Sequence, residues 1–234
     1  MLSQSVRRYL NEFGVISGKD IVLYGNNDSI YSTAIDLNNK NIKCTVVDVR
    51  SSEVQSEMIA KAKGLGIKVF QGYAILKANG THLVQSIELS QVVLQGKEWN
   101  VSAGSEQLKC DLLATSGGFN PVVHLDCHCG AKTFYDEVSQ SFLPQKERNN
   151  RQVCGSVAGV GAWQDAVSDA KNKAKLTLKS LVIVKKIDQD KLSTNYLNFF
   201  NVSQFFTPVE ILNRPKVFLD MQNDVTTLDV ALSI

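Results

Sequence analysis

The stretch DIVLYGNNDSIYSTAIDLNNKNIKCTVVDVR, from Asp20 to Arg50, decides the fold of this chain because it reads as a strand, a turn, a helix and a second strand. The continuous apolar run at 21–24 is typical of a strand buried on both faces, and Gly25 ends it. Polar residues that can cap a helix follow, and apolar residues then recur at helical spacing. The second strand covers 44–47. Asp48 stands where a nucleotide-binding crossover carries an acid for a ribose hydroxyl.

The turn after the first strand lacks most of the glycines of a dinucleotide fingerprint. Gly25 is present, but Asn27 and Ile30 stand where a second glycine lets the backbone approach a pyrophosphate and a third lets helix and strand pack closely. Asp28 adds negative charge at a helix end that would otherwise attract phosphate. The stretch therefore predicts the fold of a nucleotide-binding crossover and argues against nucleotide binding at this turn.

Composition excludes several classes of protein. The chain has 234 residues, of which 44% are hydrophobic and 21% charged, as in ordinary globular proteins. Its net charge of +2 is spread along the sequence, so no basic face for nucleic acid is expected. The longest apolar run, 181–184, is too short to span a bilayer, and the N-terminus resembles an amphipathic helix and not a secretion signal. We expect a cytoplasmic protein without nucleic-acid or membrane partners.

The cysteines and histidines allow a metal site but do not favour one. Cys127-His128-Cys129, with His124 three residues earlier, lacks a second ligand pair at a recognised spacing. A structural or interface role is favoured, and no metal ligand is assigned. The two histidines could be general bases, but their apolar neighbours favour packed or interface side chains. An odd number of cysteines suits reduced thiols: Cys44, Cys110, Cys127, Cys129 and Cys154.

The order of elements predicts an α/β fold in which a three-layer Rossmann-like domain joins a parallel sheet to an antiparallel meander. A helix at 6–13 and a linker precede this domain, which covers 18–116. Its further expected elements are a helix at 53–63, a strand at 67–70, antiparallel strands at 74–76, 83–89 and 91–94, and a return strand at 108–115.

This order resembles the inner NAD(P)-binding domain of flavoproteins that carry two dinucleotide-binding domains. In that family the chain leaves the inner domain through a turn like 115–121, TSGGFNP, and the outer domain's last helix begins at a turn like 155–159, GSVAG. The resemblance implies a partial outer dinucleotide-binding domain at 117–180. Ser156 replaces the flavin-binding aspartate of the family, which argues against flavin here.

A more specific resemblance is to the alpha subunit of heterotetrameric sarcosine oxidase. It is carried by GNNDS at 25–29, GGFNPVVHL at 117–125, GSVAG at 155–159 and VFLDMQNDVT at 217–226. It implies a complex with beta, gamma and delta subunits that oxidises sarcosine to glycine, transfers a one-carbon unit to tetrahydrofolate and forms hydrogen peroxide. FAD, FMN and tetrahydrofolate would be bound elsewhere in that complex. The tail at 181–234 would lead toward a folate-binding domain.

The glycine-rich turn before the helix expected at 163–178 is the candidate cofactor site, because it brings backbone N–H groups to a helix N-terminus. The resemblance implies that a tightly held NAD contacts this turn. A helix start with glycines for close packing is the alternative. Most NAD contacts would lie in a preceding half of the family's proteins, so weak binding is expected here. The candidate residues are Ser156, Val157, Gly161, Ala162 and Trp163.

No residue of the chain is assigned a catalytic role, so a structural and NAD-supporting function is expected. Two other classes stay open: a subunit of a related amine, proline or opine dehydrogenase, and a non-catalytic assembly module. The aromatic residues at 196–200 and 205–206 predict a tail that packs on a partner subunit or back on the chain's own sheet.

Overall fold

The computed structural model describes residues 1–96, 98–145, 151–161, 163–181, 203, 218–220, 225–226 and 232. The predicted N-terminal helix is present as α1 (Ser3–Phe13), and it ends at Gly14, whose φ of 64° is the left-handed conformation that glycine adopts readily. Residues before α1 lie beside the return strand, since the Met1 ammonium donates to the carbonyl oxygen of Leu113 at 2.9 Å.

A four-stranded parallel sheet forms the centre of the first unit, in the strand order β3-β2-β1-β8. This confirms the predicted α/β fold with a parallel sheet and a return strand. The helix expected at 53–63 begins later, because the Ser56 hydroxyl accepts the N–H of Ile59 and caps it there. The elements are β1 (Ile21–Gly25), α2 (Ser29–Asn38), β2 (Cys44–Asp48), α3 (Glu57–Gly64), β3 (Lys68–Gln71) and β8 (Leu112–Ser116).

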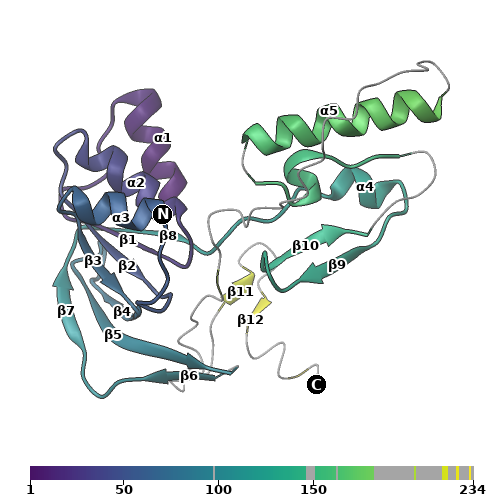
Figure 1. Cartoon of the computed structure of the whole chain (residues 1–234). Coiled ribbons are helices and arrows are strands. Elements are labelled where there is room, and N and C mark those ends of the chain that lie inside the picture. The colour runs from purple at the N-terminus through teal and green to yellow at the C-terminus, as the bar shows by residue number, and fades with distance from the viewer. Residues whose placement is uncertain are drawn as a thin grey trace.

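The central sheet is covered on both faces, which gives the three layers visible in Figure 1. Alternate residues of β1 point to opposite faces: Ile21 and Leu23 pack with α1, α2 and α3, whereas Val22 and Tyr24 pack with the antiparallel strands. All of β1 is buried, as its continuous apolar sequence predicted.

The antiparallel layer differs from the prediction in its strand boundaries. The strands expected at 83–89 and 91–94 are one long strand, β5. The strand expected at 108–115 is divided into β7 and β8, because the Asp111 carboxylate accepts the backbone N–H groups of Lys19 and Asp20 and redirects the chain. The strands of this layer are β4 (Tyr73–Asn79), β5 (Ser86–Gln95), β6 (Glu98–Val101) and β7 (Glu106–Lys109).

The residues after β8 form a second group of elements. Its helix α5 (Trp163–Ser180) agrees with the helix predicted from 163, whereas its β-hairpin was not predicted. In the tail, β11 (Phe218–Asp220) pairs with β12 (Val225–Thr226), and the aromatic residues at 196–200 and 205–206 lie outside the described residues. The other elements are α4 (His124–His128), β9 (Thr133–Asp136), β10 (Ser141–Pro144) and the 3-10 helix η1 (Gly155–Ala158).

Among the described residues, no helix combines the length and the apolar character that a membrane span requires. The division of the chain into an inner domain, a partial outer domain and a tail stays a prediction.

Candidate functional site

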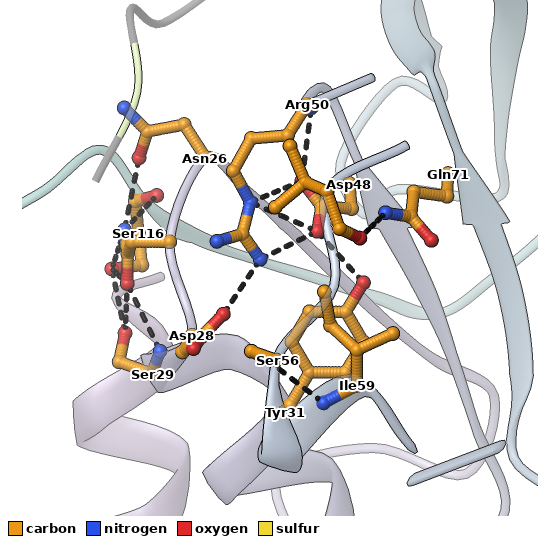
Figure 2. A network of polar contacts seen from close by, with 12 residues as sticks. Asn26, Asp28, Ser29, Tyr31, Asp48, Arg50, Ser56, Ile59, Gln71 and Ser116 are labelled. Atoms are coloured by element: carbon orange, nitrogen blue, oxygen red, sulfur yellow. Dashed lines mark hydrogen bonds and ion pairs between the residues drawn. The ribbon is translucent and has the colours of Figure 1, made fainter. Parts of the chain in front are cut away.

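The β1–α2 turn is filled by its own polar side chains, which Figure 2 shows in detail. Asn27 is fully buried, and its amide nitrogen donates to the backbone carbonyl and the hydroxyl of Ser116, both at 3.1 Å. Its amide oxygen accepts the N–H of Ser29 at 3.1 Å and the Ser29 hydroxyl at 2.6 Å. Groups that would face a phosphate in a dinucleotide fingerprint are therefore bonded to one another.

A buried arginine joins the two acidic residues of this crossover. The Nη2 atom of Arg50 lies 2.8 Å from Asp28 Oδ1 and 2.7 Å from Asp48 Oδ2, and the side chains are 1%, 6% and 0% exposed. Asp48 also accepts the hydroxyl of Tyr31 at 2.7 Å. Asp48 stands where a nucleotide-binding crossover carries its ribose-binding acid, but its carboxylate is enclosed by protein donors.

Burial and the charges of the cluster itself determine the pKa values of its side chains. Burial would lower the pKa of Arg50, but the hydrogen bonds and negative charges of Asp48 and Asp28 outweigh it and hold the guanidinium pKa above its ordinary value. Burial, followed by the charge of Asp48, raises the pKa of the Tyr31 hydroxyl well above its ordinary value. The negative charge that Asp28 adds at the start of α2 is buried and paired with Arg50.

Close packing completes the enclosure of the β1–α2 turn. A Cβ atom on Gly25 would lie 2.6 Å from the carbonyl oxygen of Ser116 and 2.8 Å from Cγ2 of Ile30, which is fully buried. The carbonyl oxygen of Asn26 accepts the N–H of Ser203 at 3.0 Å, and the Asn26 amide donates to the Ser203 carbonyl oxygen. The residues of this turn do not fit a dinucleotide phosphate.

The second glycine-rich turn, at η1, opens into a pocket of about 190 Å³. Three of the predicted cofactor residues, Ser156, Val157 and Gly161, line it together. Ala162 lies outside the described residues, and Trp163 begins α5, with a side chain that the structure does not describe. The pocket is completed by Phe119, Asn120, Pro121, Val122, Ser139, Ser141, Gly159 and Val160.

The glycines of this turn have structural reasons that agree with the alternative of close packing. Gly155 has a φ of 66°, and its N–H donates to the Asp169 carboxylate of α5 at 2.9 Å. Gly159 has a φ of 82°, and a Cβ atom there would lie 2.9 Å from a methyl group of Leu143. The left-handed backbone at both positions and the close packing at Gly159 explain these two glycines, and the pocket lies against Gly159 and the residues on either side of it.

The pocket's lining determines what it can bind. None of its lining residues is acidic or basic, and Phe119, Pro121, Val122, Val157 and Val160 give it an apolar character. Its polar groups are the Asn120 amide and three serine hydroxyls. Such a lining fits a neutral ring and offers no cation for a phosphate.

The hydroxyls at one side of the pocket belong to a small network on the β9–β10 hairpin. Ser141 is buried, and its Oγ lies 2.8 Å from that of Ser139. The Ser139 hydroxyl also donates to Asp136 Oδ2 at 2.7 Å. The hairpin that the sequence did not predict therefore positions two of the four polar side chains of the pocket.

The histidines and the Cys-x-Cys pair lie apart from this pocket, on and after α4. His124, Cys127, His128 and Cys129 are exposed, so the expectation of packed histidines is wrong, and the interface alternative stays a prediction. All five cysteines are free thiols. Within the described part of the chain no group of three or more His, Cys, Asp or Glu side chains could hold a metal ion.

Sequence reasoning missed the two residues on which these sites depend most. Arg50 was quoted only as the end of the crossover, although two buried acids in one crossover require a cation, and an arginine two residues after Asp48 was available. Phe119 was used only as part of the GGFNPVVHL resemblance. Its place in the pocket depends on how the segment after β8 folds back toward η1, which local sequence does not reveal.

Comparisons with known proteins agree with the resemblance. The chain is 34% identical over 169 residues to sarcosine oxidase subunit alpha of Corynebacterium strain P-1 and 35% identical to that of strain U-96; each match covers 72% of this chain and 17% of the relative. A third subunit alpha, from Rhizobium meliloti, is 22% identical; this match covers the whole of this chain and 22% of the relative. No family model matches the sequence.

Similar solved structures include a bacillithiol disulfide reductase from Staphylococcus aureus, with a TM-score of 0.49, 15% identity and coverage of 72% of this chain and 52% of that one. A ferredoxin reductase from Rhodopseudomonas palustris has a TM-score of 0.49, 17% identity and coverage of 78% and 45%. This chain spans about a fifth of the length of the sequence relatives or less. It is related to the alpha subunit of sarcosine oxidase, as its GGFNPVVHL and QNDVT segments indicated.

Proposed function

We propose that this chain is part of the alpha subunit of a sarcosine oxidase-like complex, where it supports a bound NAD and has no catalytic residue of its own. The observation that carries the proposal is the pocket at η1. Two motifs that define the resemblance, GGFNPVVHL and GSVAG, are separated by 29 residues in the sequence and line this pocket together. Sequence relatives named sarcosine oxidase subunit alpha support the same assignment.

The cofactor is assigned to this pocket by contrast with the β1–α2 turn. The pocket is lined by Ser156, Val157 and Gly161 and fits a neutral ring of NAD. In the turn, the polar groups that could bind a phosphate are already hydrogen-bonded to one another. A bound NAD would fill this pocket with its adenine, the ring that is uncharged in both the oxidised and the reduced cofactor. The residues of the chain itself position that ring and exclude water from it.

The proposal includes the partners and the reaction that the resemblance implies. The proposed complex contains beta, gamma and delta subunits, oxidises sarcosine to glycine and passes the one-carbon unit to tetrahydrofolate, with FAD and FMN bound outside this chain. A subunit of a related amine, proline or opine dehydrogenase and a non-catalytic assembly module are the alternatives. Co-purification of a tagged chain with the products of neighbouring genes tests the complex, and recovery of the chain alone would contradict it.

Titration calorimetry with NAD tests the cofactor assignment directly. We expect weak binding, on the order of 1 mM or about 4 kcal/mol, because a ring pocket without a cation supplies few strong contacts. Val157→Trp fills the pocket and should abolish binding. Val138→Trp, at the exposed tip of the hairpin, is the matched control and should leave the affinity unchanged. No heat of binding with the folded wild-type chain, or equal loss in both variants, would contradict the assignment.

A further inference from the structure

A second pocket, of about 350 Å³, lies on the first unit and shares one residue with the ring pocket. Phe119 lines both. The other residues of the second pocket come from α1 and from the first turns of α2: Gln4, Arg7, Arg8, Asn11, Glu12, Ser29 and Thr33. Phe119 is therefore shared by an uncharged pocket and one with charged side chains.

The charges of the second pocket favour an anion. Arg7 and Arg8 line it against a single carboxylate, that of Glu12. Arg8 is paired with Glu12 through Nε at 2.8 Å, one turn along α1. Arg7 is paired through Nε with Asp36, which does not line the pocket, at 2.5 Å. Among the described residues, the only hydrogen bond of the Arg7 guanidinium comes from Nε, and a guanidinium can also bind a phosphate through its two terminal nitrogens.

The ring pocket by itself is too small for a whole nucleotide. The ring pocket, at about 190 Å³, is smaller than the roughly 300–1,000 Å³ of usual ligand sites, and the two together, about 540 Å³, lie within this range. The two pockets also differ in the charge of their lining residues: the ring pocket is uncharged, and the second pocket has two guanidinium groups.

We infer that the two pockets form one extended site for a nucleotide, with its ring beside Val157, its sugar passing Phe119, and its phosphate bound by Arg7. This inference rests on the proposed function, because it takes the ring to lie in the η1 pocket. It adds a phosphate-binding residue on α1, far from either glycine-rich turn in the sequence.

The test compares ligands that differ only in a phosphate. AMP should bind the wild-type chain about tenfold more tightly than adenosine, the size of effect expected for a charge-assisted contact of about 1.4 kcal/mol. In Arg7→Gln the two ligands should bind equally, at the affinity of adenosine. Binding is measured by ligand-observed NMR titration of the full chain, with a thermal melt to verify folding.

Two variants separate phosphate binding from the packing of α1 on α2. Asp36→Asn breaks the same ion pair but keeps the arginine, so the preference for AMP should stay or increase. Lys40→Gln removes an exposed cation from the other end of α2 and should have no effect. Loss of the preference in Asp36→Asn would show that Arg7 acts through packing and would overturn the inference.

The failure of this inference is distinguishable from the failure of the proposed function. If NAD binds and Val157→Trp abolishes binding, but Arg7→Gln leaves the affinities for AMP and NAD unchanged, the inference is overturned and the ring pocket stands. If neither NAD, AMP nor adenosine binds the folded chain, the proposed function and the inference are both overturned.

Discussion

The β1–α2 turn and the η1–α5 turn are both glycine-containing turns before a helix, yet one is closed and the other open. In the first, Asn27, Ser29 and Ser116 bond to one another and Arg50 neutralises two buried acids. In the second, Ser156 and Val157 line a pocket. The comparison shows that a nucleotide-type crossover can keep its strand and helix as a scaffold while its own side chains replace the ligand.

The largest expected effect comes from removing the cation of the closed turn. Arg50→Met leaves the buried negative charges of Asp28 and Asp48 without a cation, which should lower the free energy of unfolding by about 3–5 kcal/mol. Urea denaturation followed by circular dichroism measures it. Arg7→Gln, which breaks a half-exposed pair, should cost about 1 kcal/mol or less.

A triple variant sharpens this prediction. Adding Asp28→Asn and Asp48→Asn to Arg50→Met removes the unpaired charges, so most of the lost stability should return. If the triple variant is as unstable as Arg50→Met alone, shape and not charge is what Arg50 contributes. In either case the stability lost in Arg50→Met should be the same at low salt as at high salt, since buried charges are weakly screened.

Thiol reactivity should also differ between the central sheet and the second group of elements, which follows β8. Cys44, in β2, has its pKa raised to about 11 by burial, so at pH 8 only about one thiol in a thousand is the reactive thiolate. Cys127, Cys129 and Cys154 in the second region are exposed. Iodoacetamide labelling followed by mass spectrometry should modify these three at least about a hundredfold faster.

The pH dependence of the labelling rate shows whether the pKa of Cys44 is raised. A raised pKa keeps the Cys44 thiol protonated as the pH rises from 7 to 10, and its labelling rate should still be increasing tenfold per pH unit at pH 10. A rate that levels off near pH 9 would show an ordinary thiol pKa and contradict the burial of this side chain.

A smaller effect is expected from Gly25→Ala. The added methyl group would lie 2.6 Å from the Ser116 carbonyl oxygen, so the chain should lose about 1–3 kcal/mol of stability. The affinity for NAD should not change, because Gly25 serves packing and not a phosphate. Gly64→Ala, where no atom lies within 4 Å and the φ angle is not left-handed, is the control for a methyl group added without a close contact. A reduced affinity for NAD in folded Gly25→Ala would show that the cofactor binds at the β1–α2 turn and would contradict its assignment to the η1 pocket.

Local sequence was sufficient where one pattern controls one element. The apolar run of β1, the helix before Gly14 and the helix beginning at Trp163 were predicted because burial, a left-handed glycine and helical periodicity are local signals. The sequence did not predict the hairpin β9–β10. It also did not predict the break in the strand at 108–115, because this break depends on hydrogen bonds that the distant Lys19 and Asp20 N–H groups donate to the Asp111 carboxylate.

The candidate site could be predicted only in part for the same reason. Ser156, Val157 and Gly161 were predicted from their position in a family turn, and the three residues line one pocket. Phe119, Ser139 and Ser141 reach that pocket from other segments. No periodicity or spacing in the sequence relates these residues to η1, so only the tertiary fold identifies them.

The location of bound NAD tests the central claim most directly. In a nitrogen-15 NMR titration of the full chain, added NAD should shift the backbone amide signals of Ser156, Val157 and Phe119, while those of Asn26, Asn27 and Asp28 stay in place. Shifts confined to the β1–α2 turn, with the η1 signals unchanged, would contradict the claim that this turn is closed by its own side chains and that the cofactor lies at the second.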